Sequence, residues 1–136
     1  MSILSGKCLF NKVSYSCNTE PIAIFNCHFK DCRKATGSVF GTNLFFSANN
    51  VEINGKLSSF KHISDSGSTM TKFFCPCCGS LLFGKNSSKK NVISIRAGTI
   101  DQINKIKSTI NIFMDSKVPS TIIDKKLKQT NRMPIT

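Results

Sequence analysis

The sequence lacks tryptophan and contains a single tyrosine, whereas eleven of its 136 residues are phenylalanine. We therefore interpret the apolar aromatic residues as core-filling rather than as a surface set for recognition. The sequence also lacks the run of about 18 apolar residues that a membrane span needs. Its first residues, MSILSGK, show no basic segment followed by an apolar one, which argues against a secretory signal. We expect a soluble, cytoplasmic protein with a single zinc-binding domain over residues 1–136.

Acidic residues are scarce, with seven Asp and Glu against nineteen Lys and Arg, and the formal net charge is +12. Such an excess of positive charge attracts anions. Only three of the basic residues are arginine, the better bidentate phosphate reader, and no block of five consecutive basic residues occurs. We therefore favour a solvated basic surface, keep nucleic acid as a weakly supported partner, and note that a small anionic ligand fits the charge. No carboxylates are paired in sequence, so no general base is indicated.

An odd number of cysteines, seven, argues against a disulfide scaffold. In a reducing compartment, clustered cysteines indicate metal binding or catalysis instead. The segment FFCPCCGSLLFG at Phe73–Gly84 places Cys75 and Cys78 at CxxC spacing in a turn rich in Pro and Gly. Such a turn directs both thiols to one point, as in half of a tetrahedral zinc site. Cys77, between them, should point elsewhere, as a small apolar residue or an alternative ligand.

A second group, NCHFKDCRKATG, contains Cys27 and Cys32 at a looser spacing. Neighbouring lysine and arginine residues lower a thiol pKa, so the pattern indicates an accessible thiol pair. The spacing alone leaves metal ligation, catalysis and a reversible disulfide open. His28 could ligate, act as a base or face away, and ranks below the thiols. Cys8 and Cys17 are isolated in sequence, and each taken singly is more typical of a buried structural cysteine.

Short apolar runs separated by Gly, Asn, Ser and Asp predict a mainly β fold with short helices. The alternation is cleanest in VISIRAG at Val92–Gly98, and further strands are expected at Val39–Phe46, Leu57–Ile63, Lys72–Cys75, Leu81–Phe83 and Ile110–Met114. NGK at Asn54–Lys56 predicts a hairpin-type turn. Lys30–Gly37 predicts a helical turn ended by its glycine, and Thr99–Lys107 a short helix or turn. The polar stretch over about residues 125–136 is expected to be a loosely held tail.

Four motifs, taken in order, resemble the glutathione-dependent formaldehyde-activating enzymes, a family that includes centromere protein V-like proteins. They are GKCLFNKVSY at Gly6–Tyr15, CHFKDCRKATG at Cys27–Gly37, FCPCCGS at Phe74–Ser80 and AGTID at Ala97–Asp101. The resemblance implies an Mss4-like β-sheet fold and zinc as cofactor. It also implies a carbon–sulfur lyase that acts on the adduct of an aldehyde with glutathione or another small thiol.

The resemblance further implies two zinc sites. Cys8, Cys75 and Cys78 would belong to a structural site. Cys27 and Cys32 would hold a catalytic zinc that leaves one coordination position open for a thiol substrate, and would be the catalytic residues.

The sequence departs from the family pattern at both implied sites. Phe10 stands where the second Cys of the first motif is expected, and Phe29 stands where the middle Cys of CHCxxC is expected. Asn11 replaces the glycine that follows the first motif. If the two phenylalanines lie close in the fold, they could pack together. Such packing would only partly offset a lost metal, because burying one Phe contributes about 1.5–3 kcal/mol and a structural zinc about 10–16 kcal/mol.

We predict from these departures that the first site keeps its zinc and that the second is weakened or empty. The fourth ligand of the first site would come from Cys77, Cys17, His28 or water. An alternative to the lyase is a catalytically degenerate, zinc-stabilised binding module whose basic surface binds an anion, a protein or nucleic acid. A reversible disulfide within CHFKDC is a third alternative.

Overall fold

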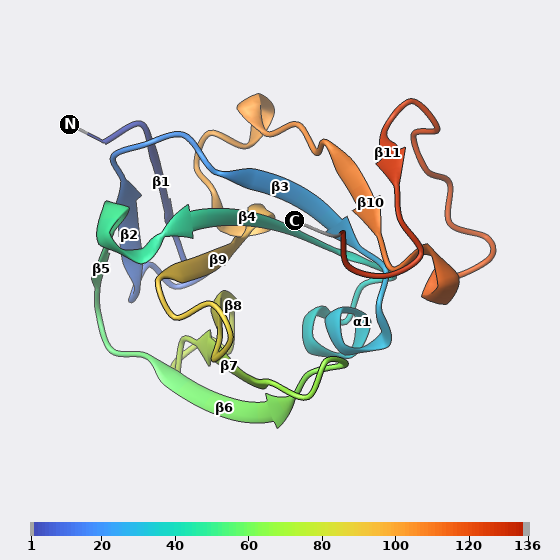
Figure 1. Ribbon diagram of the computed structural model, residues 1–136. Helices are drawn as coiled ribbons and strands as arrows, with labels where there is room; N and C mark the ends of the chain where they lie inside the picture. The colour runs from blue at the N-terminus through green and yellow to red at the C-terminus, as the bar shows by residue number, and fades with distance from the viewer. Residues whose placement is uncertain (1, 135–136) are drawn as a thin grey trace.

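The computed structural model describes residues 2–134, and its strands form two sheets (Figure 1). The smaller sheet is antiparallel and has the order β1-β2-β5, formed by β1 (Leu4–Lys7), β2 (Ser14–Cys17) and β5 (Val51–Asn54). The larger sheet has the order β11-β10-β3-β4-β9-β8-β7-β6. Its strands are β3 (Ala23–Cys27), β4 (Gly41–Ser47), β6 (Ser58–Ile63), β7 (Thr69–Phe74), β8 (Leu81–Asn86), β9 (Val92–Arg96), β10 (Ile110–Ile112) and β11 (Lys128–Gln129). The predicted mainly β fold is confirmed.

Helical segments are short. They are α1 (Lys30–Thr36) and the 3-10 turns η1 (Ala48–Asn50), η2 (Ala97–Thr99), η3 (Ile103–Lys105) and η4 (Met114–Ser116). Gly37 ends α1 as predicted, with a left-handed φ of 76° and its N–H donating to the Arg33 carbonyl at 2.7 Å. The helix expected within 99–107 is interrupted, because Ile100 is extended and buried and its backbone bridges to Gly6. No helix within residues 2–134 is long and apolar enough to cross a membrane.

The hairpin expected at Asn54–Lys56 is wrong, because this turn joins strands of different sheets. β5 pairs with β2, whereas β6 pairs with β7. Gly55 adopts a φ of 109°, and a side chain there would come within 2.3 Å of the Lys12 carbonyl oxygen. The glycine is therefore needed both for its conformation and for the close passage of the chain. The local signal predicted the turn but not the partners of the strands that flank it.

The main core lies where the two sheets face each other. Its largest buried side chains include Phe46, Phe83, Leu44 and Leu82, and the ring of Tyr15 meets that of Phe83 edge-on at 5.2 Å. Three of the cysteines, Cys8, Cys17 and Cys75, belong to this cluster. Gly6 approaches so closely that a side chain would lie 2.2 Å from the Tyr15 hydroxyl, which is itself 2.7 Å from Thr99 Oγ1. These contacts join GKC to AGTID, two of the motifs recognised in the sequence.

A second, smaller cluster lies at the α1 end of the larger sheet. It consists of buried Cys27, Ile110, Ile112 and Phe113, with Phe25, Phe29 and Cys32 packed against it. β10 runs parallel to both β3 and β11, which brings residues 128–129 beside it. The loosely held tail stays a prediction, and residues 135–136 lie outside the described part. Figure 1 shows the larger sheet curving, so that β3 and β6 lie on opposite sides with α1 at the open end between them.

Candidate metal centre and thiol pocket

The two halves of the predicted metal site come together in space. The sulfur atoms of Cys8, Cys75 and Cys78 all lie within 4.8 Å of one another. Cys8 follows β1, and the other two follow β7, so loops from both sheets meet here. Within residues 2–134 this is the only group of three or more metal-ligating side chains at such a spacing.

Backbone N–H groups point at the sulfur atoms of this cluster. Those of Lys12 and Val13 donate to Cys8 Sγ at 3.2 and 3.3 Å, and that of Cys77 donates to Cys75 Sγ at 3.4 Å. Such donors orient thiolates and offset their negative charge, as the outer partners of metal ligands do. The arrangement therefore fits a thiolate-binding cation such as zinc.

Each loop of the centre turns at a residue with positive φ. Gly79 has φ 75°, and Asn11 has φ 60° where the family pattern has glycine. Asparagine enters the left-handed region more readily than other residues with a side chain. The N–H of Asn11 donates to the Cys8 carbonyl at 3.0 Å. Asn11 therefore keeps the turn that the glycine would otherwise provide.

The hydrogen bonds at the second loop favour a thiolate at Cys78. Ser80 Oγ accepts the N–H of Leu9 at 3.1 Å, which leaves its own proton for Cys78 Sγ at 3.2 Å. That hydrogen bond, with backbone N–H groups of Ser80 and Phe10, lowers the pKa of Cys78 to about 6. The N–H of Cys78 lowers the pKa of Cys75, but burial and the neighbouring thiols leave it raised on balance. A bound cation would favour the thiolate form of all three.

No protein side chain among the predicted candidates completes the centre. Cys17 is buried in the main core, where burial raises its pKa to about 11, and Cys77 is exposed. His28 is buried elsewhere, 4.9 Å from the ring of Phe40 and 3.4 Å from Asn111 Oδ1. Phe10 is 58% exposed, so its ring does not fill the missing position with packed core. Water remains as the predicted fourth ligand.

Cys27 and Cys32 form a separate thiol pair. Cys27 is buried at the end of β3, and Cys32, on α1, packs against its cluster. A hydrogen bond between the two thiols raises the pKa of Cys27 and lowers that of Cys32. Both are free thiols, and their reversible disulfide stays a prediction.

Phe29 blocks the third position of the second site with core packing. Its ring stacks on Phe113 at a centroid distance of 4.6 Å, within the cluster that contains Cys27. The packing of Phe10 with Phe29 that the sequence suggested does not occur, because Phe10 is exposed at the metal centre and Phe29 is packed in the smaller cluster. Within the described chain, no third ligand joins Cys27 and Cys32, so these residues do not fit a zinc ion.

A guanidinium group takes part in this second site instead. The Arg96 side chain approaches Cys32 and, after the hydrogen bond from Cys27, contributes to its lowered pKa. Gly41 makes the approach possible, since a side chain there would lie 2.8 Å from Arg96 Nη1. That nitrogen is buried without a hydrogen-bond partner. An unpaired buried donor beside a thiol favours an anionic sulfur at this point.

A pocket of about 220 Å³ lies between α1, β6 and β7. Its lining includes Asp31, Lys34 and Ala35 from α1, Phe60 and His62 from β6, and Lys72 from β7. Lys72 is only 4% exposed, and desolvation lowers its pKa. Phe60 is 44% exposed, contrary to the expectation that the phenylalanines would all be core-filling.

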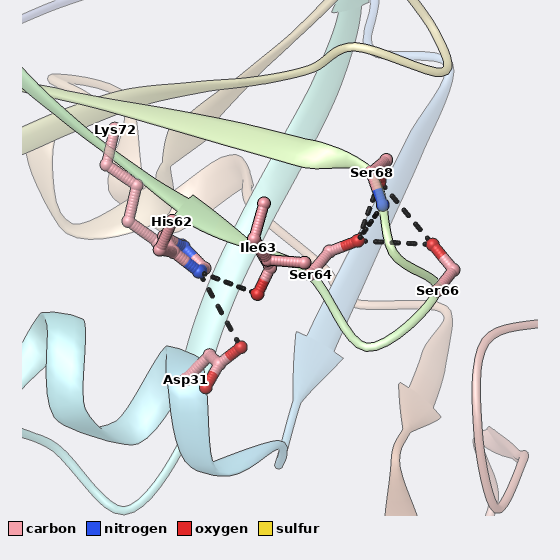
Figure 2. Close-up of polar contacts among 7 residues, drawn as sticks. All are labelled: Asp31, His62, Ile63, Ser64, Ser66, Ser68 and Lys72. Carbon is pink, nitrogen blue, oxygen red and sulfur yellow. Dashed lines mark hydrogen bonds and ion pairs between the residues drawn. The ribbon is translucent and has the colours of Figure 1, made fainter.

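The polar residues of this pocket form a chain of contacts (Figure 2). His62 Nε2 bonds with Lys72 Nζ, and Nδ1 lies 3.3 Å from the Ile63 carbonyl and 3.8 Å from Asp31 Oδ2. Both groups beside Nδ1 are acceptors, so Nδ1 carries a proton and Nε2 presents its lone pair to Lys72. Figure 2 shows the Ser64–Ser68 turn next to these residues, closed by a 2.6 Å bond between the Ser64 and Ser68 hydroxyls.

Sequence reasoning missed His62, Lys72 and Arg96 as a group. His62 is paired with Met70, so Lys72, two residues further along β7, is its diagonal neighbour on the same face. Arg96 comes from β9, at the end of the clean VISIR alternation. The strand patterns were visible in the sequence, but the register that brings these side chains to α1 was not.

The fold and the sites define a class: a mainly β protein with a cluster of three thiols that could hold a metal ion, a separate thiol pair and a polar pocket. Residues 3–116 match the family described as glutathione-dependent formaldehyde-activating enzyme. The match covers most of the chain, and the chain belongs to this family. The predicted resemblance is therefore confirmed.

Comparison with solved structures supports the same fold. A crystal structure of a Rhodobacter sphaeroides protein aligns with a TM-score of 0.58 and 14% sequence identity. The alignment covers 74% of this chain and 91% of that protein. The sequence matches none of the curated proteins.

Proposed function

We propose that Cys8, Cys75 and Cys78 hold a zinc ion that stabilises the fold. Three sulfur atoms within 4.8 Å of one another and the N–H donors around them support this assignment. Zinc bound there would join the loop after β1 to the loop after β7, and so link the two sheets. The centre lies among core residues rather than in the pocket, which favours a structural role.

For the pocket beside α1, we propose carbon–sulfur lyase chemistry on the adduct of an aldehyde with glutathione or another small anionic thiol, in the cytoplasm. The observation that carries this proposal is that Lys72, which bonds with His62, lies within electrostatic reach of both Cys32 and Arg96 in a family member. Lys34 at the pocket wall offers a cation for the carboxylates of such a thiol. Cys27 and Cys32 remain the proposed catalytic thiols.

The chemistry requires one proton transfer and one bond cleavage. The hydroxyl proton of the adduct passes to the Lys72–His62 pair, the carbon–sulfur bond breaks, and the electron pair stays on the sulfur. Arg96 stabilises the resulting thiolate through its unpaired Nη1. Return of the proton to the sulfur completes the conversion of the adduct into free thiol and aldehyde. In this proposal Cys32 would lie next to the departing sulfur, and the hydrogen bond with Cys27 would hold the Cys32 thiol in place.

Exchange spectroscopy on carbon-13 formaldehyde mixed with glutathione tests the proposal, since it measures interconversion of the adduct with free formaldehyde directly. The protein should accelerate the exchange, and Arg96→Gln should slow it, whereas Lys90→Gln, which removes an exposed charge outside both sites, should not. Equal exchange rates with and without the protein would contradict the proposal.

The packing of Phe29 on Phe113 specifically favours a second candidate, the catalytically degenerate zinc-stabilised binding module. Such a protein would bind the small thiol or its adduct without accelerating exchange. Saturable binding to the wild type, weakened by Arg96→Gln, combined with an unchanged exchange rate would favour the module over the lyase.

A further inference from the structure

From the contacts in Figure 2 we infer that Lys72 is a nucleophilic amine that captures the aldehyde carbon as an imine. This inference rests on the proposed function for the class of substrate, an aldehyde, and identifies Lys72 as the residue that binds it covalently. Free lysine amines react readily with aldehydes, but an ammonium group does not. Lys72 must therefore be held as a neutral amine in order to react.

The imidazole of His62 provides a proton acceptor for Lys72. Its Nε2 lone pair faces Nζ, and its protonated Nδ1 lies between the Ile63 carbonyl and Asp31 Oδ2. When the ammonium gives its proton to Nε2, the imidazolium that forms has Asp31 at 3.8 Å as its counter-ion. The arrangement is that of a carboxylate, an imidazole and a nucleophile in sequence, with an amine in the place that a hydroxyl or thiol takes elsewhere.

Burial also favours the neutral amine form of Lys72. The Lys72 side chain is almost completely removed from water, and this desolvation disfavours its ammonium form. Arg96 also disfavours a positive charge there, whereas Cys32, Asp31 and Cys27 oppose this effect. The pKa of Lys72 is lowered on balance. The residue still lines the pocket, so a small aldehyde can reach its nitrogen.

Imine formation needs only the aldehyde and Lys72, with His62 carrying the proton, and releases one water molecule. The Lys72 amine adds to the carbonyl carbon, and a proton transfer through His62 gives a neutral carbinolamine. Loss of the hydroxyl group as water, with the proton returned by His62, leaves the carbon–nitrogen double bond. Hydrolysis by the reverse route releases the aldehyde again.

Reductive trapping tests the inference in the full-length, zinc-loaded protein. Limiting formaldehyde and cyanoborohydride at neutral pH convert an imine into a methylated lysine, which peptide mass spectrometry locates among the sixteen lysines. Lys61, an exposed residue on β6, is the matched internal control. Methylation of Lys72 should exceed that of Lys61 several-fold, because burial and the His62 acceptor favour the free amine at Lys72.

His62→Gln should reduce the labelling of Lys72 several-fold while leaving that of Lys61 unchanged, and Asp31→Asn should reduce the labelling of Lys72 less. Labelling of Lys72 no faster than that of Lys61 in the wild type would overturn the inference, as would unchanged labelling in His62→Gln. Because Lys61 is measured in the same molecule, a general loss of structure is distinguished from a local effect. Free formaldehyde is the probe, so trapping fails or succeeds separately from the thiol exchange that tests the proposed function.

Discussion

At the scale of single residues, we expect Phe29 to determine how many zinc ions the chain binds. Phe29→Cys would restore a third thiolate beside Cys27 and Cys32, so the zinc content should rise from one ion per chain to two. Loss of the stacking on Phe113 should destabilise the metal-free variant by less than the about 3–5 kcal/mol of a fully buried Phe, because Phe29 is only partly buried. Elemental analysis and unfolding in a chelator measure the two effects.

Phe10→Cys is the matched control for this experiment. It adds a thiol next to Cys8 and Cys78, where three sulfur atoms already gather. The variant should hold its zinc more tightly against a chelator, with no increase in the number of ions. A zinc content of one in Phe29→Cys would show that packing alone does not empty the second site.

Ionisation of Cys17 should make the folded protein less stable at alkaline pH. Burial raises its pKa from 9.0 to about 11, so the folded protein favours the neutral thiol. This contribution is fully present below pH 9.0 and is lost as the pH rises toward about 11, when the unfolded chain ionises first. The shift corresponds to about 3 kcal/mol.

Urea unfolding from pH 8 to 11 measures this effect. Cys17→Ala removes the titrating group, so its stability should fall less steeply over the interval than that of the wild type. Tyr15→Phe is the control for another buried group whose pKa burial raises. Parallel pH profiles for Cys17→Ala and the wild type would contradict the assignment.

At the scale of the elements, the loop from Cys8 to Val13 depends on the conformation of Asn11. With φ at 60°, Asn11→Gly should be nearly neutral, whereas Asn11→Val should cost about 1–2 kcal/mol and weaken metal binding. Thermal unfolding and competition with a chelating dye measure these outcomes. Equal zinc affinity in the two variants would mean that the left-handed turn does not position Cys8.

The sequence predicted local features of the helix and strands, but not which strands pair with each other. CxxC at Cys75 and Cys78 indicated a half-site because its geometry is local, and Gly37 indicated the end of α1 for the same reason. NGK was misinterpreted because strand pairing is decided by distant segments. The His62–Lys72 contact depends on the register of β6 and β7, which no single segment encodes.

At the scale of the whole molecule, the proposed zinc ion would connect loops of the two sheets. A structural zinc contributes about 10–16 kcal/mol in small zinc-binding peptides, as much as the net stability of about 5–15 kcal/mol of a typical protein. A strong chelator should therefore lower the Tm sharply or abolish the cooperative transition, and added zinc should restore it. Circular dichroism during heating checks this, and an unchanged Tm in the chelator would argue against a structural ion.

The net charge of +12 is also a property of the whole molecule, and it favours anionic partners. A small anionic ligand could bind in the pocket that Lys34 and Lys72 line. Nucleic-acid binding stays an untested prediction. Binding to nucleic acid would weaken steeply with added salt, because each phosphate contact releases counter-ions. A titration at two salt concentrations distinguishes such binding from that of a small thiol.

The central claim is that this family member keeps a metal at Cys8, Cys75 and Cys78 and leaves Cys27 and Cys32 without one. Elemental analysis of tag-free protein, purified without added metal, tests it most directly. We predict one zinc per chain, lost in Cys75→Ser and retained in Cys27→Ser. Two zinc ions per chain, with one lost in Cys27→Ser, would contradict the account, because Phe29 would then not have emptied the second site.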